Sequence, residues 1–453
     1  MKKVHLSMIN LWCNKNLVDS QLFLWKLLSE YSDKIEYYSD PYDSAVEIVL
    51  LNTCGFISSG REEMFKTLEK LLRKKKKVCI IWCGVQYFEK VLKSKNVLDN
   101  EYKSELDKRE SLLKNENISY LSRNDLTFAN IESLTKRSQT FEDFCRYSAP
   151  RLLTNYENRY EYIKIAEWCN NSCAFCIIPQ IRWKLTSLPI KSVLLETENL
   201  LKQWIEELII VAQDTMRYGT DFSSKSQLLP LLHELDKLPY DFKYRILYLY
   251  PDILTLKQLE EFATLEKFIP YFDIPLQHIS PKLLKSMGRF YDDKMIHTLL
   301  KWIRNLFPNS FIRTNIIIWF PWETEEDMRL LQSFLNEDYF DNVAIFEYHD
   351  EPLAKSSTFE NKIPYSTIHK RFSIIRKQVY NLLKSREARR KWKNQIGFVE
   401  SIDQLNDQIF LSIRPEINCP EIDPIDEVKL ENVIQCFDGE EIEIGSMVEY
   451  ILK

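Results

Sequence analysis

The stretch EWCNNSCAFCIIP, residues 167–179, places three cysteines at C-x3-C-x2-C spacing. It overlaps the end of the apolar run YIKIAEW, residues 162–168, which we interpret as a strand. Three thiolates on one loop can hold three irons of a 4Fe-4S cluster and leave the fourth iron open to another ligand. A zinc site usually has four ligands in paired CxxC units, and no fourth Cys or His lies close in the sequence. The spacing therefore indicates an iron–sulfur cluster on Cys169, Cys173 and Cys176.

A long series of alternating strands and helices starts at this loop. Amphipathic helical stretches such as residues 292–306 and 326–335 separate the apolar runs. Six βα units in series favour a barrel or partial barrel, whose chemistry lies at the C-terminal ends of the strands. The predicted strands span residues 162–168, 207–214, 244–250, 271–277, 311–319 and 343–349.

Two further regions flank this series. Predicted strands at residues 4–13, 46–54 and 78–83 alternate with helices, which indicates a parallel α/β layer, and each strand ends at a cysteine. Residues 396–453 contain only short alternating runs, which are typical of a small antiparallel β-barrel. We therefore predict an α/β protein with an N-terminal parallel α/β domain, a central partial (β/α)6 barrel and a C-terminal β-barrel. The expected domains span residues 1–140, 155–385 and 390–453.

The composition is that of a folded, soluble protein, with 45% hydrophobic and 28% charged residues. The net charge of -5 argues against a nucleic-acid surface spread over the whole chain. The start lacks the apolar segment of a signal peptide, and no apolar run approaches the ~20 residues of a membrane span. We expect a cytoplasmic protein with no membrane partner, and the ten cysteines then favour metal or redox chemistry over disulfides.

These motifs resemble the radical S-adenosylmethionine (SAM) superfamily and, more narrowly, its methylthiotransferases. That family carries a second three-cysteine set, which Cys13 in LWCNKNLVDSQ, Cys54 in LNTCGFI and Cys83 in IWCGVQY match one by one. The stretches 211–221, 248–251, 272–289 and 419–423 are similar to the RimO-type branch, which modifies an aspartate of a small-subunit ribosomal protein.

The resemblance implies two 4Fe-4S clusters, SAM, and an electron donor such as flavodoxin or ferredoxin. It implies a radical SAM barrel in the centre and a TRAM β-barrel at the end, in a protein that we expect to be a monomer. Radical cleavage of SAM would start hydrogen abstraction from the aspartate β-carbon, and the second cluster would supply the sulfur. No catalytic residue is expected beyond the cluster ligands. The predicted metal ligands are Cys13, Cys54, Cys83, Cys169, Cys173 and Cys176.

Polar residues at the predicted strand ends are the candidates for the cofactor and substrate pocket. Arg313 could pair with a ligand carboxylate in bidentate geometry or with a neighbouring barrel carboxylate, and His278 could be a buried hydrogen-bonding residue. The expected cofactor-binding residues are Gln213, Tyr248, Gln277, Arg313 and Glu323, with Asp214 and His278 as further pocket candidates. The acidic cluster Glu416, Glu421, Asp423 and Asp426 suits a basic ribosomal partner or is a solvated loop.

The chain departs from this family in one repeated way. It has 8 glycines and 10 tryptophans, where about 7% glycine is ordinary. We hypothesise that UGA codons read as glycine in the source organism have been translated as tryptophan; TGG codons there would refute this. The family has glycine at Trp12, Trp82, Trp168, Trp183, Trp319 and Trp322, and Trp25 and Trp204 look like further cases.

Three other interpretations stay open. Genuine tryptophans would crowd the clusters and mark a degenerate, inactive paralogue. A non-catalytic iron–sulfur or RNA-binding protein would fit that case. A tRNA adenosine methylthiotransferase is the alternative enzyme.

Overall fold

The computed structural model describes residues 3–453 except for 12, 56–57, 82, 86, 88–89, 91–108, 111, 122–150, 154–158, 182–183, 364 and 440. Trp12, Trp82 and Trp183 therefore lie outside the described residues. The chain forms two compact units, each with its own sheets. Unit 1 comprises residues 1–154, 167–199 and 349–357, and unit 2 comprises residues 155–166, 200–348 and 358–453. The division into three domains stays a prediction.

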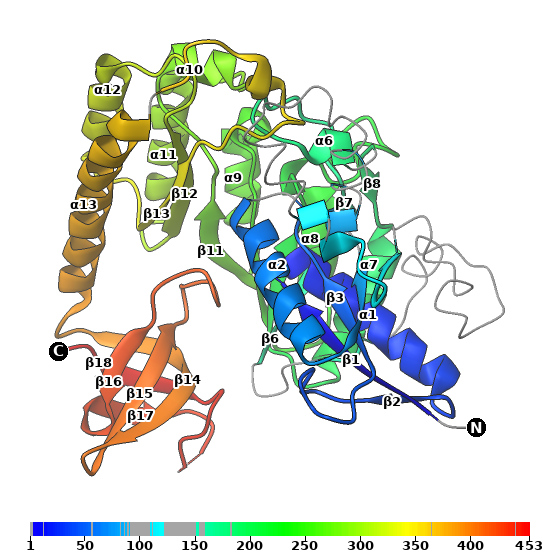
Figure 1. The fold of residues 1–453 in the computed structure, drawn as a ribbon. Helices are drawn as coiled ribbons and strands as arrows, with labels where there is room; N and C mark the ends of the chain where they lie inside the picture. The colour runs from blue at the N-terminus through cyan, green and yellow to red at the C-terminus, as the bar shows by residue number, and fades with distance from the viewer. Residues whose placement is uncertain are drawn as a thin grey trace. The chain divides into compact units, whose positions relative to one another are not determined.

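Unit 1 is built on a five-stranded parallel sheet (Figure 1). Its strand order is β2-β1-β3-β4-β5, so the strands predicted to end at cysteines are neighbours. The strands are β1 (Val4–Asn10), β2 (Ile35–Tyr37), β3 (Ile48–Asn52), β4 (Lys77–Ile81) and β5 (Ile118–Leu121). The helices are α1 (Asn14–Tyr31), α2 (Ser58–Arg73), α6 (Ile178–Ile181) and α7 (Ile190–Leu201), and β7 (Ala166–Glu167) pairs with β8 (Thr186–Ser187).

The two faces of this sheet carry separate hydrophobic cores. Val49 and Leu51 of β3 pack in one core together with α2, and Leu50 packs in the other together with α1. Successive side chains of a strand point to opposite faces, so α1 and α2 cover opposite sides of the sheet. The parallel α/β layer predicted from the sequence is confirmed.

Unit 2 contains a six-stranded parallel sheet whose strands follow chain order, β6-β9-β10-β11-β12-β13. An ordered run of βα units with two open edges is a partial barrel, as predicted. The strands are β6 (Tyr160–Lys164), β9 (Glu207–Val211), β10 (Lys243–Ile246), β11 (Phe268–Asp273), β12 (Phe311–Ile318) and β13 (Asn342–Glu347).

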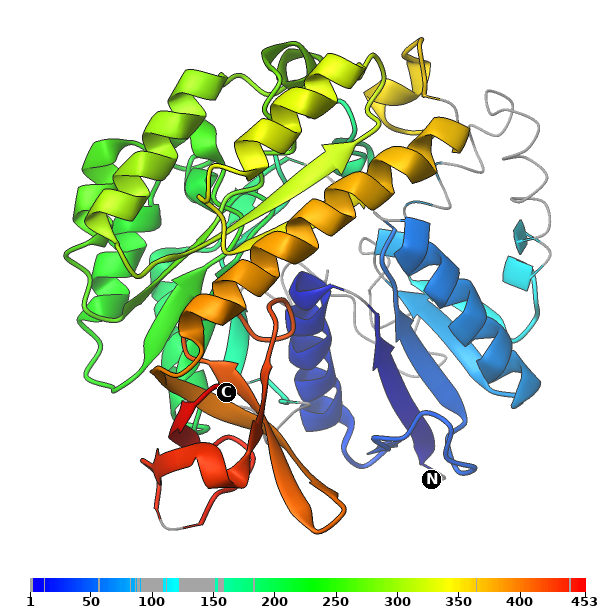
Figure 2. The same ribbon diagram turned by 90° about the vertical axis from the view of Figure 1, so that its left-hand side faces the viewer.

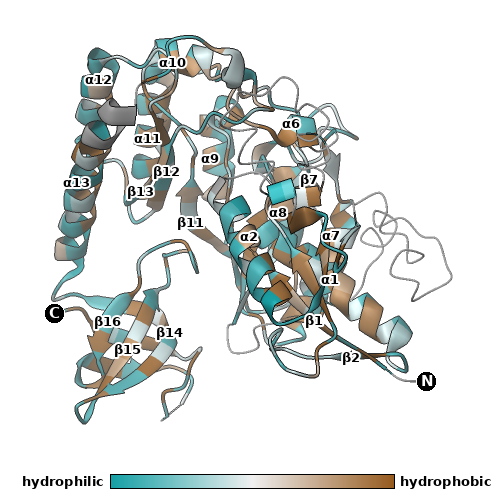
Figure 3. Ribbon diagram, in the orientation of Figure 1, coloured by the Kyte–Doolittle hydropathy of each residue, from teal (hydrophilic) through white to brown (hydrophobic). Residues whose placement is uncertain are grey.

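The helices of unit 2 follow the predicted apolar periodicity. In α11 the buried residues Ile296, Leu299, Leu300 and Ile303 recur at helical spacing and face the sheet. Figure 3 shows apolar strands β11 to β13 beside the more polar helix α13. The helices are α8 (Leu228–Asp236), α9 (Leu256–Phe262), α10 (Pro281–Ser286), α11 (Asp293–Leu306), α12 (Glu325–Leu335) and α13 (Tyr365–Arg390). Its short 3-10 turns are η2 (Thr215–Arg217), η3 (Pro251–Ile253) and η5 (Leu430–Asn432). The turn η4 (Lys355–Thr358) begins in the part of unit 1 that spans residues 349–357.

The end of α13 leads into a five-stranded antiparallel sheet (Figure 2). Val399, Ile413 and Val448 lie in its core. The strand order β16-β15-β14-β18-β17 confirms the predicted antiparallel C-terminal structure. The strands are β14 (Asn394–Leu405), β15 (Gln408–Pro415), β16 (Asp426–Lys429), β17 (Val433–Cys436) and β18 (Met447–Ile451).

The loop between β15 and β16 is fastened to the six-stranded sheet by buried polar contacts. Arg245 donates to the carbonyl oxygens of Glu416 and Ile417, each over 2.8 Å. Its Nε lies 2.5 Å from Oε1 of Glu207, and Arg414 lies 3.0 Å from the other oxygen of that carboxylate. These contacts fix the C-terminal sheet on the central one within unit 2.

Two of the four carboxylates in the predicted acidic cluster, Asp423 and Asp426, are buried, whereas Glu421 is exposed. Asp423 is buried and accepts a hydrogen bond of 2.6 Å from Asn342. Asp426 is buried and accepts a hydrogen bond of 2.6 Å from the hydroxyl of Tyr450. The prediction that a basic partner binds these two carboxylates was wrong, because both are buried and hydrogen-bonded to residues of the same chain.

No helix in the described ranges is long and apolar enough to cross a membrane.

Candidate functional site

Three successive strands of the central sheet end in residues with left-handed backbone. Tyr248 after β10 has φ 62°, Gln277 after β11 has φ 72°, and Trp319 after β12 has φ 69°. These strands are neighbours and parallel, so their carboxyl ends lie along one edge. Residues held in sparsely populated backbone conformations cluster at ligand-binding sites. This edge, where the sequence predicted the pocket, is therefore our candidate site in unit 2.

Backbone contacts hold these strand ends in place. The amide of Tyr248 donates to Oδ2 of Asp273 over 3.0 Å. Gln277 donates to the carbonyl of Asn315 and accepts from the amide of Ile317, both over 2.7 Å. The backbone of Gln277 thereby extends the β11–β12 ladder, which fixes its position beside β12.

Two amide oxygens along this edge are buried and have no hydrogen-bond partner among the described residues. They are Oε1 of Gln213 and Oδ1 of Asn315. An unpaired buried acceptor is costly, so both indicate a ligand that donates hydrogen bonds. The sequence predicted Gln213 but missed Asn315. One feature of the sequence could have pointed to Asn315. It is a polar residue in the otherwise apolar second half of β12, two positions after Arg313 and therefore on the same face of the strand.

Arg313 forms an ion pair with a neighbouring carboxylate of the sheet. Of the two partners that the sequence left open, a ligand carboxylate or a barrel carboxylate, the structure shows the second. Its Nη1 lies 2.8 Å from Oδ1 of Asp273. Burial alone would lower the pKa of Arg313, but Asp273 raises it above the usual range. Asp214 is likewise buried and lies 3.1 Å from the guanidinium of Arg217.

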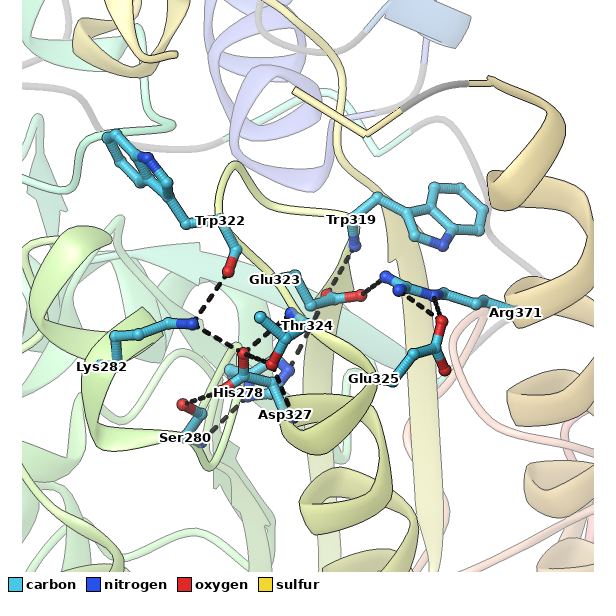
Figure 4. A network of polar contacts seen from close by, with 10 residues as sticks. All are labelled: His278, Ser280, Lys282, Trp319, Trp322, Glu323, Thr324, Glu325, Asp327 and Arg371. Atoms are coloured by element: carbon cyan, nitrogen blue, oxygen red, sulfur yellow. Dashed lines mark hydrogen bonds and ion pairs between the residues drawn. The ribbon is translucent and has the colours of Figure 1, made fainter. Parts of the chain in front are cut away.

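The turn after β12 is closed by the side chain of Glu323 (Figure 4). Its Oε2 accepts a hydrogen bond of 2.7 Å from the amide of Trp319, and its Oε1 lies 3.1 Å from Nη1 of Arg371. Burial raises the pKa of Glu323 to about 7, against the opposing effect of the Trp319 amide and Arg371. Glu323 therefore shapes the turn, and its predicted contact with a cofactor stays a prediction.

A second set of polar contacts ties α10 to the start of α12 (Figure 4). Asp327 accepts hydrogen bonds from Ser280 over 2.6 Å and from Lys282 over 3.0 Å. Lys282 also donates to the carbonyl of Trp322 over 2.9 Å. His278 is fully buried, which lowers its pKa to about 4, and its Nδ1 accepts from the amide of Ser280. The interpretation of His278 as a satisfied hydrogen-bonding residue rather than a catalyst holds for Nδ1 only. Its buried Nε2 has no hydrogen-bond partner among the described residues and lies 3.9 Å from Oε2 of Glu323.

The loop that carries Cys169, Cys173 and Cys176 lies in unit 1. The amide of Asn171 donates to Sγ of Cys169 over 3.4 Å, and the amide of Cys176 donates to the carbonyl of Cys173 over 3.1 Å. All three cysteines are partly exposed. An N–H donor on a sulfur suits a thiolate ligand.

The other three cysteines follow neighbouring strands of the five-stranded sheet. Cys13 caps the start of α1, Cys54 follows β3, and Cys83 follows β4. Sγ of Cys83 lies 3.8 Å from Oδ1 of Asn16, whose amide nitrogen donates to the carbonyl of Thr53 over 3.2 Å. The fold thus brings residues far apart in the sequence to one edge of the sheet, as predicted.

Each cysteine set is a candidate ligand set for an iron–sulfur cluster. Among the described residues, no three His, Cys, Asp or Glu side chains are placed to hold one metal ion. A 4Fe-4S cluster instead takes each thiolate on a different iron, so its ligands stand further apart. Three cysteines on one loop, or after three adjacent strands, supply that number of thiolates.

The described tryptophans support the hypothesis that glycine is the native residue at several positions. Trp168, Trp204, Trp319, Trp322 and Trp392 all have φ between 61° and 72°. Glycine adopts this conformation freely, whereas a bulky residue does so rarely. The indole nitrogen of Trp319 is also buried without a partner among the described residues. Trp25 and Trp302 lie inside α1 and α11, so the argument from φ does not extend to them.

Comparisons with known proteins show which family this chain belongs to. The Radical SAM superfamily model matches residues 163–335, and the model of uncharacterized protein family UPF0004 matches residues 5–100. The ribosomal protein uS12 methylthiotransferase RimO of Clostridium tetani is 31% identical over 100% of this chain and 98% of its own length. The chain belongs to the RimO family of methylthiotransferases. The RimO of Nitratiruptor is 32% identical over 93% of this chain and 91% of its own length.

The solved structures similar to this RimO-family chain share its fold at low identity. The radical SAM methyltransferase TsrM from Kitasatospora setae matches with a TM-score of 0.55 and 13% identity, over 79% of this chain and 77% of its own. The cobalamin-dependent radical SAM enzyme OxsB matches with a TM-score of 0.51 and 11% identity, over 84% and 56%. These likenesses confirm the fold. The match to the Radical SAM superfamily model supports the use of SAM and a 4Fe-4S cluster.

Proposed function

We propose that this chain is a radical SAM methylthiotransferase that adds a methylthio group to the β-carbon of an aspartate in ribosomal protein uS12. The observation that carries the chemistry is the edge of the central sheet. There, left-handed residues end three successive strands, and the buried amide oxygens of Gln213 and Asn315 lack partners among the described residues. The RimO of Clostridium tetani aligns with this chain at 31% identity over 98% of its own length, which supports the same activity.

Each cysteine set has a distinct proposed role. Cys169, Cys173 and Cys176 would hold the cluster that works with SAM, and Cys13, Cys54 and Cys83 would hold a second one. When bound, the clusters and SAM supply one-electron cleavage, hydrogen abstraction and the transferred sulfur. An electron donor such as flavodoxin or ferredoxin would supply the reducing electrons.

The chain's own residues would shape and orient the site. The amide oxygens of Gln213 and Asn315 would accept hydrogen bonds from the amino group or adenine of SAM. Tyr248 and Gln277 would bring their backbone close to that ligand, since the left-handed conformation turns the chain at the strand end. Glu323 would keep the turn after β12 closed through its bond to the amide of residue 319.

The C-terminal sheet favours a protein substrate over tRNA. Residues 391–453 contain five Lys or Arg against fourteen Asp or Glu. Binding to a phosphate backbone depends on Lys and Arg, whereas an acidic surface complements a basic ribosomal protein. The exposed carboxylates, rather than the buried Asp423 and Asp426, would make that contact; they include Asp403, Asp407, Glu427, Glu431, Glu441 and Glu443.

A direct assay tests this function. The full chain is reconstituted anaerobically with iron and sulfide, supplied with SAM and a reductant, and incubated with purified uS12 or with tRNA. We expect 5'-deoxyadenosine together with a methylthio mass increase on one aspartate of uS12. A methylthio group on tRNA adenosine would select the alternative enzyme. Absence of SAM cleavage by a chain with a full iron content would reject the enzyme and favour a non-catalytic iron–sulfur protein.

A further inference from the structure

The segment of residues 349–357 belongs to unit 1, although it directly follows the last strand of the central sheet in sequence. One end contacts helix α2, and the other end contacts the loop of Cys169, Cys173 and Cys176. At one end, Oε1 of Glu351 lies 2.6 Å from Nη2 of Arg61 on α2. At the other end, the amide of Ser356 donates to the carbonyl of Ala174 over 2.8 Å, between Cys173 and Cys176.

The Glu351 end is joined to the loop of the predicted second cluster. Nη1 of Arg61 donates to the carbonyl of Gly55 over 3.1 Å, directly after Cys54. The guanidinium carbon also lies 4.3 Å from the ring centre of Tyr87, which follows Cys83 on the next strand end. Arg61 thus contacts Gly55 next to Cys54, Tyr87 shortly after Cys83, and the carboxylate of Glu351.

This contact leaves little room for adjustment. A Cβ on Gly55 would lie 2.5 Å from the carbonyl oxygen of Cys83 and 2.9 Å from Cβ of Tyr87. The side chains of Arg61 and Glu351 are 6% and 9% exposed, so water screens their attraction only weakly. A planar guanidinium with donors to two acceptors fixes direction as well as distance.

Hydrogen bonds within the segment join its two ends. The amide of Ala354 donates to the carbonyl of Glu351 over 2.8 Å, and the hydroxyl of Ser357 donates to the carbonyl of Ala354 over 2.8 Å. Ala354 packs in the same hydrophobic core as Ile177 and Ile181, which follow the Cys169–Cys176 loop. Glu351 and Ser356 are therefore joined by a short stretch that is hydrogen-bonded internally and packed against the core.

We propose that residues 349–357 form a strap that sets the spacing of the two cysteine loops, with Arg61 and Glu351 as positioning residues at its fastening. The inference rests on the proposed two-cluster function. Transfer of a methylthio group from one cluster to a substrate activated at the other requires a fixed distance between them. The strap would keep the two cysteine loops at a fixed distance from each other. Neither Arg61 nor Glu351 needs to touch a cluster for this.

The matched variants are Glu351→Gln and Glu196→Gln. Glu196 forms the comparable buried ion pair of unit 1: Nε of Arg151 lies 3.3 Å from its Oε1, with side-chain exposures of 0% and 9%. Both substitutions keep side-chain shape and remove one buried charge, so both weaken the fold. Only the first lies on the strap.

The first measurement is independent of any cluster. Amide hydrogen exchange is followed by mass spectrometry in the full-length apo chain. We expect Glu351→Gln to raise exchange at least about tenfold in peptides containing Cys54 and in peptides containing Cys173–Cys176, and Glu196→Gln to leave both sets unchanged. Unchanged exchange at either loop in Glu351→Gln, or equal increases in both variants, would overturn the strap.

The second measurement uses the reconstituted chain. Pulsed dipolar electron paramagnetic resonance gives the distance between the reduced clusters, and the assay gives methylthio product per 5'-deoxyadenosine. We expect Glu351→Gln to hold as much iron as the unsubstituted chain, with a broader distance distribution and a product ratio about tenfold lower. An unchanged distribution and ratio would overturn the proposal. If the unsubstituted chain binds only one cluster, the proposed two-cluster function is wrong. The hydrogen-exchange experiment would still decide whether the strap exists, because it needs no cluster.

Discussion

Replacing Trp204 by glycine is expected to stabilise the protein. Trp204 follows α7, has φ 67° and is 87% exposed. Its amide donates to the carbonyl of Leu201 over 3.3 Å, so the residue ends the helix in the left-handed conformation that glycine usually takes there. The exposed indole contributes little burial that the substitution would remove.

The magnitude follows from two opposing effects. A left-handed conformation costs an L-residue about 1–2 kcal/mol, and glycine does not bear this cost. Glycine loses more backbone freedom on folding, which costs about 0.5–1 kcal/mol. The net effect of Trp204→Gly is a gain of about 1 kcal/mol, or a rise of roughly 1–2 °C in the midpoint of thermal unfolding for a chain of this size.

Two further variants separate backbone strain from loss of the indole. Trp204→Ala removes the indole but keeps Cβ, so its unfolding midpoint should stay close to that of the unsubstituted chain. Trp302 lies inside α11 with helical backbone, and Trp302→Gly should destabilise by about 1 kcal/mol or more. Circular dichroism during heating measures all three. A Trp204→Gly midpoint at or below that of Trp204→Ala would refute the argument from backbone strain.

Three other predictions concern the native sequence and two buried carboxylates. A peptide mass spectrum of the protein from its source organism should show glycine at the five left-handed tryptophan positions; tryptophan there would reject the translation hypothesis. Burial raises the pKa of Glu323 from 4.5 to about 7, so its stabilising contribution is full below about pH 4.5 and is lost as the pH rises through about 7. The unfolding midpoint of the unsubstituted chain should therefore fall relative to that of Glu323→Gln across this range, and a constant difference would contradict the assignment. Glu207→Gln leaves Arg245 without its buried carboxylate and should lower the free energy of unfolding by about 3–5 kcal/mol, measured by denaturant titration. Glu234→Gln, at an exposed ion pair, should change it by less than about 1 kcal/mol; equal losses would show that burial does not govern the effect.

The secondary structure was predictable because periodicity is a local property. The apolar run at residues 311–319 became β12, and the helical spacing at 292–306 became α11. The predicted strands extend further toward the C-terminus than the strands in the structure. The expected strand 207–214 ends its ladder at Val211, because Gln213 and Asp214 already belong to the connection at the candidate site. Apolar pattern does not distinguish the last ladder residue from the first residue of a tight turn.

The candidate site was predictable in composition but not in its contacts. The sequence placed Gln213, Tyr248, Gln277 and Glu323 at strand ends, yet gave no means to see that Glu323 bonds to the amide of Trp319. Asn315 was missed, because a polar residue in a strand becomes significant only when its side chain is buried without a partner. The acidic loop was misread, because burial of Asp423 depends on segments far away in the chain.

The sequence alone determined the spacing of Cys169, Cys173 and Cys176, the order of strands and helices, and the excess of tryptophan over glycine. These are properties of neighbouring residues and of composition. Only the tertiary structure decided which tryptophans occupy left-handed backbone, that the cysteine-ending strands β1, β3 and β4 are neighbours, and that Arg61 meets Glu351 across nearly 300 residues of chain. Such contacts depend on how the sheets and connections pack, and no local pattern records them.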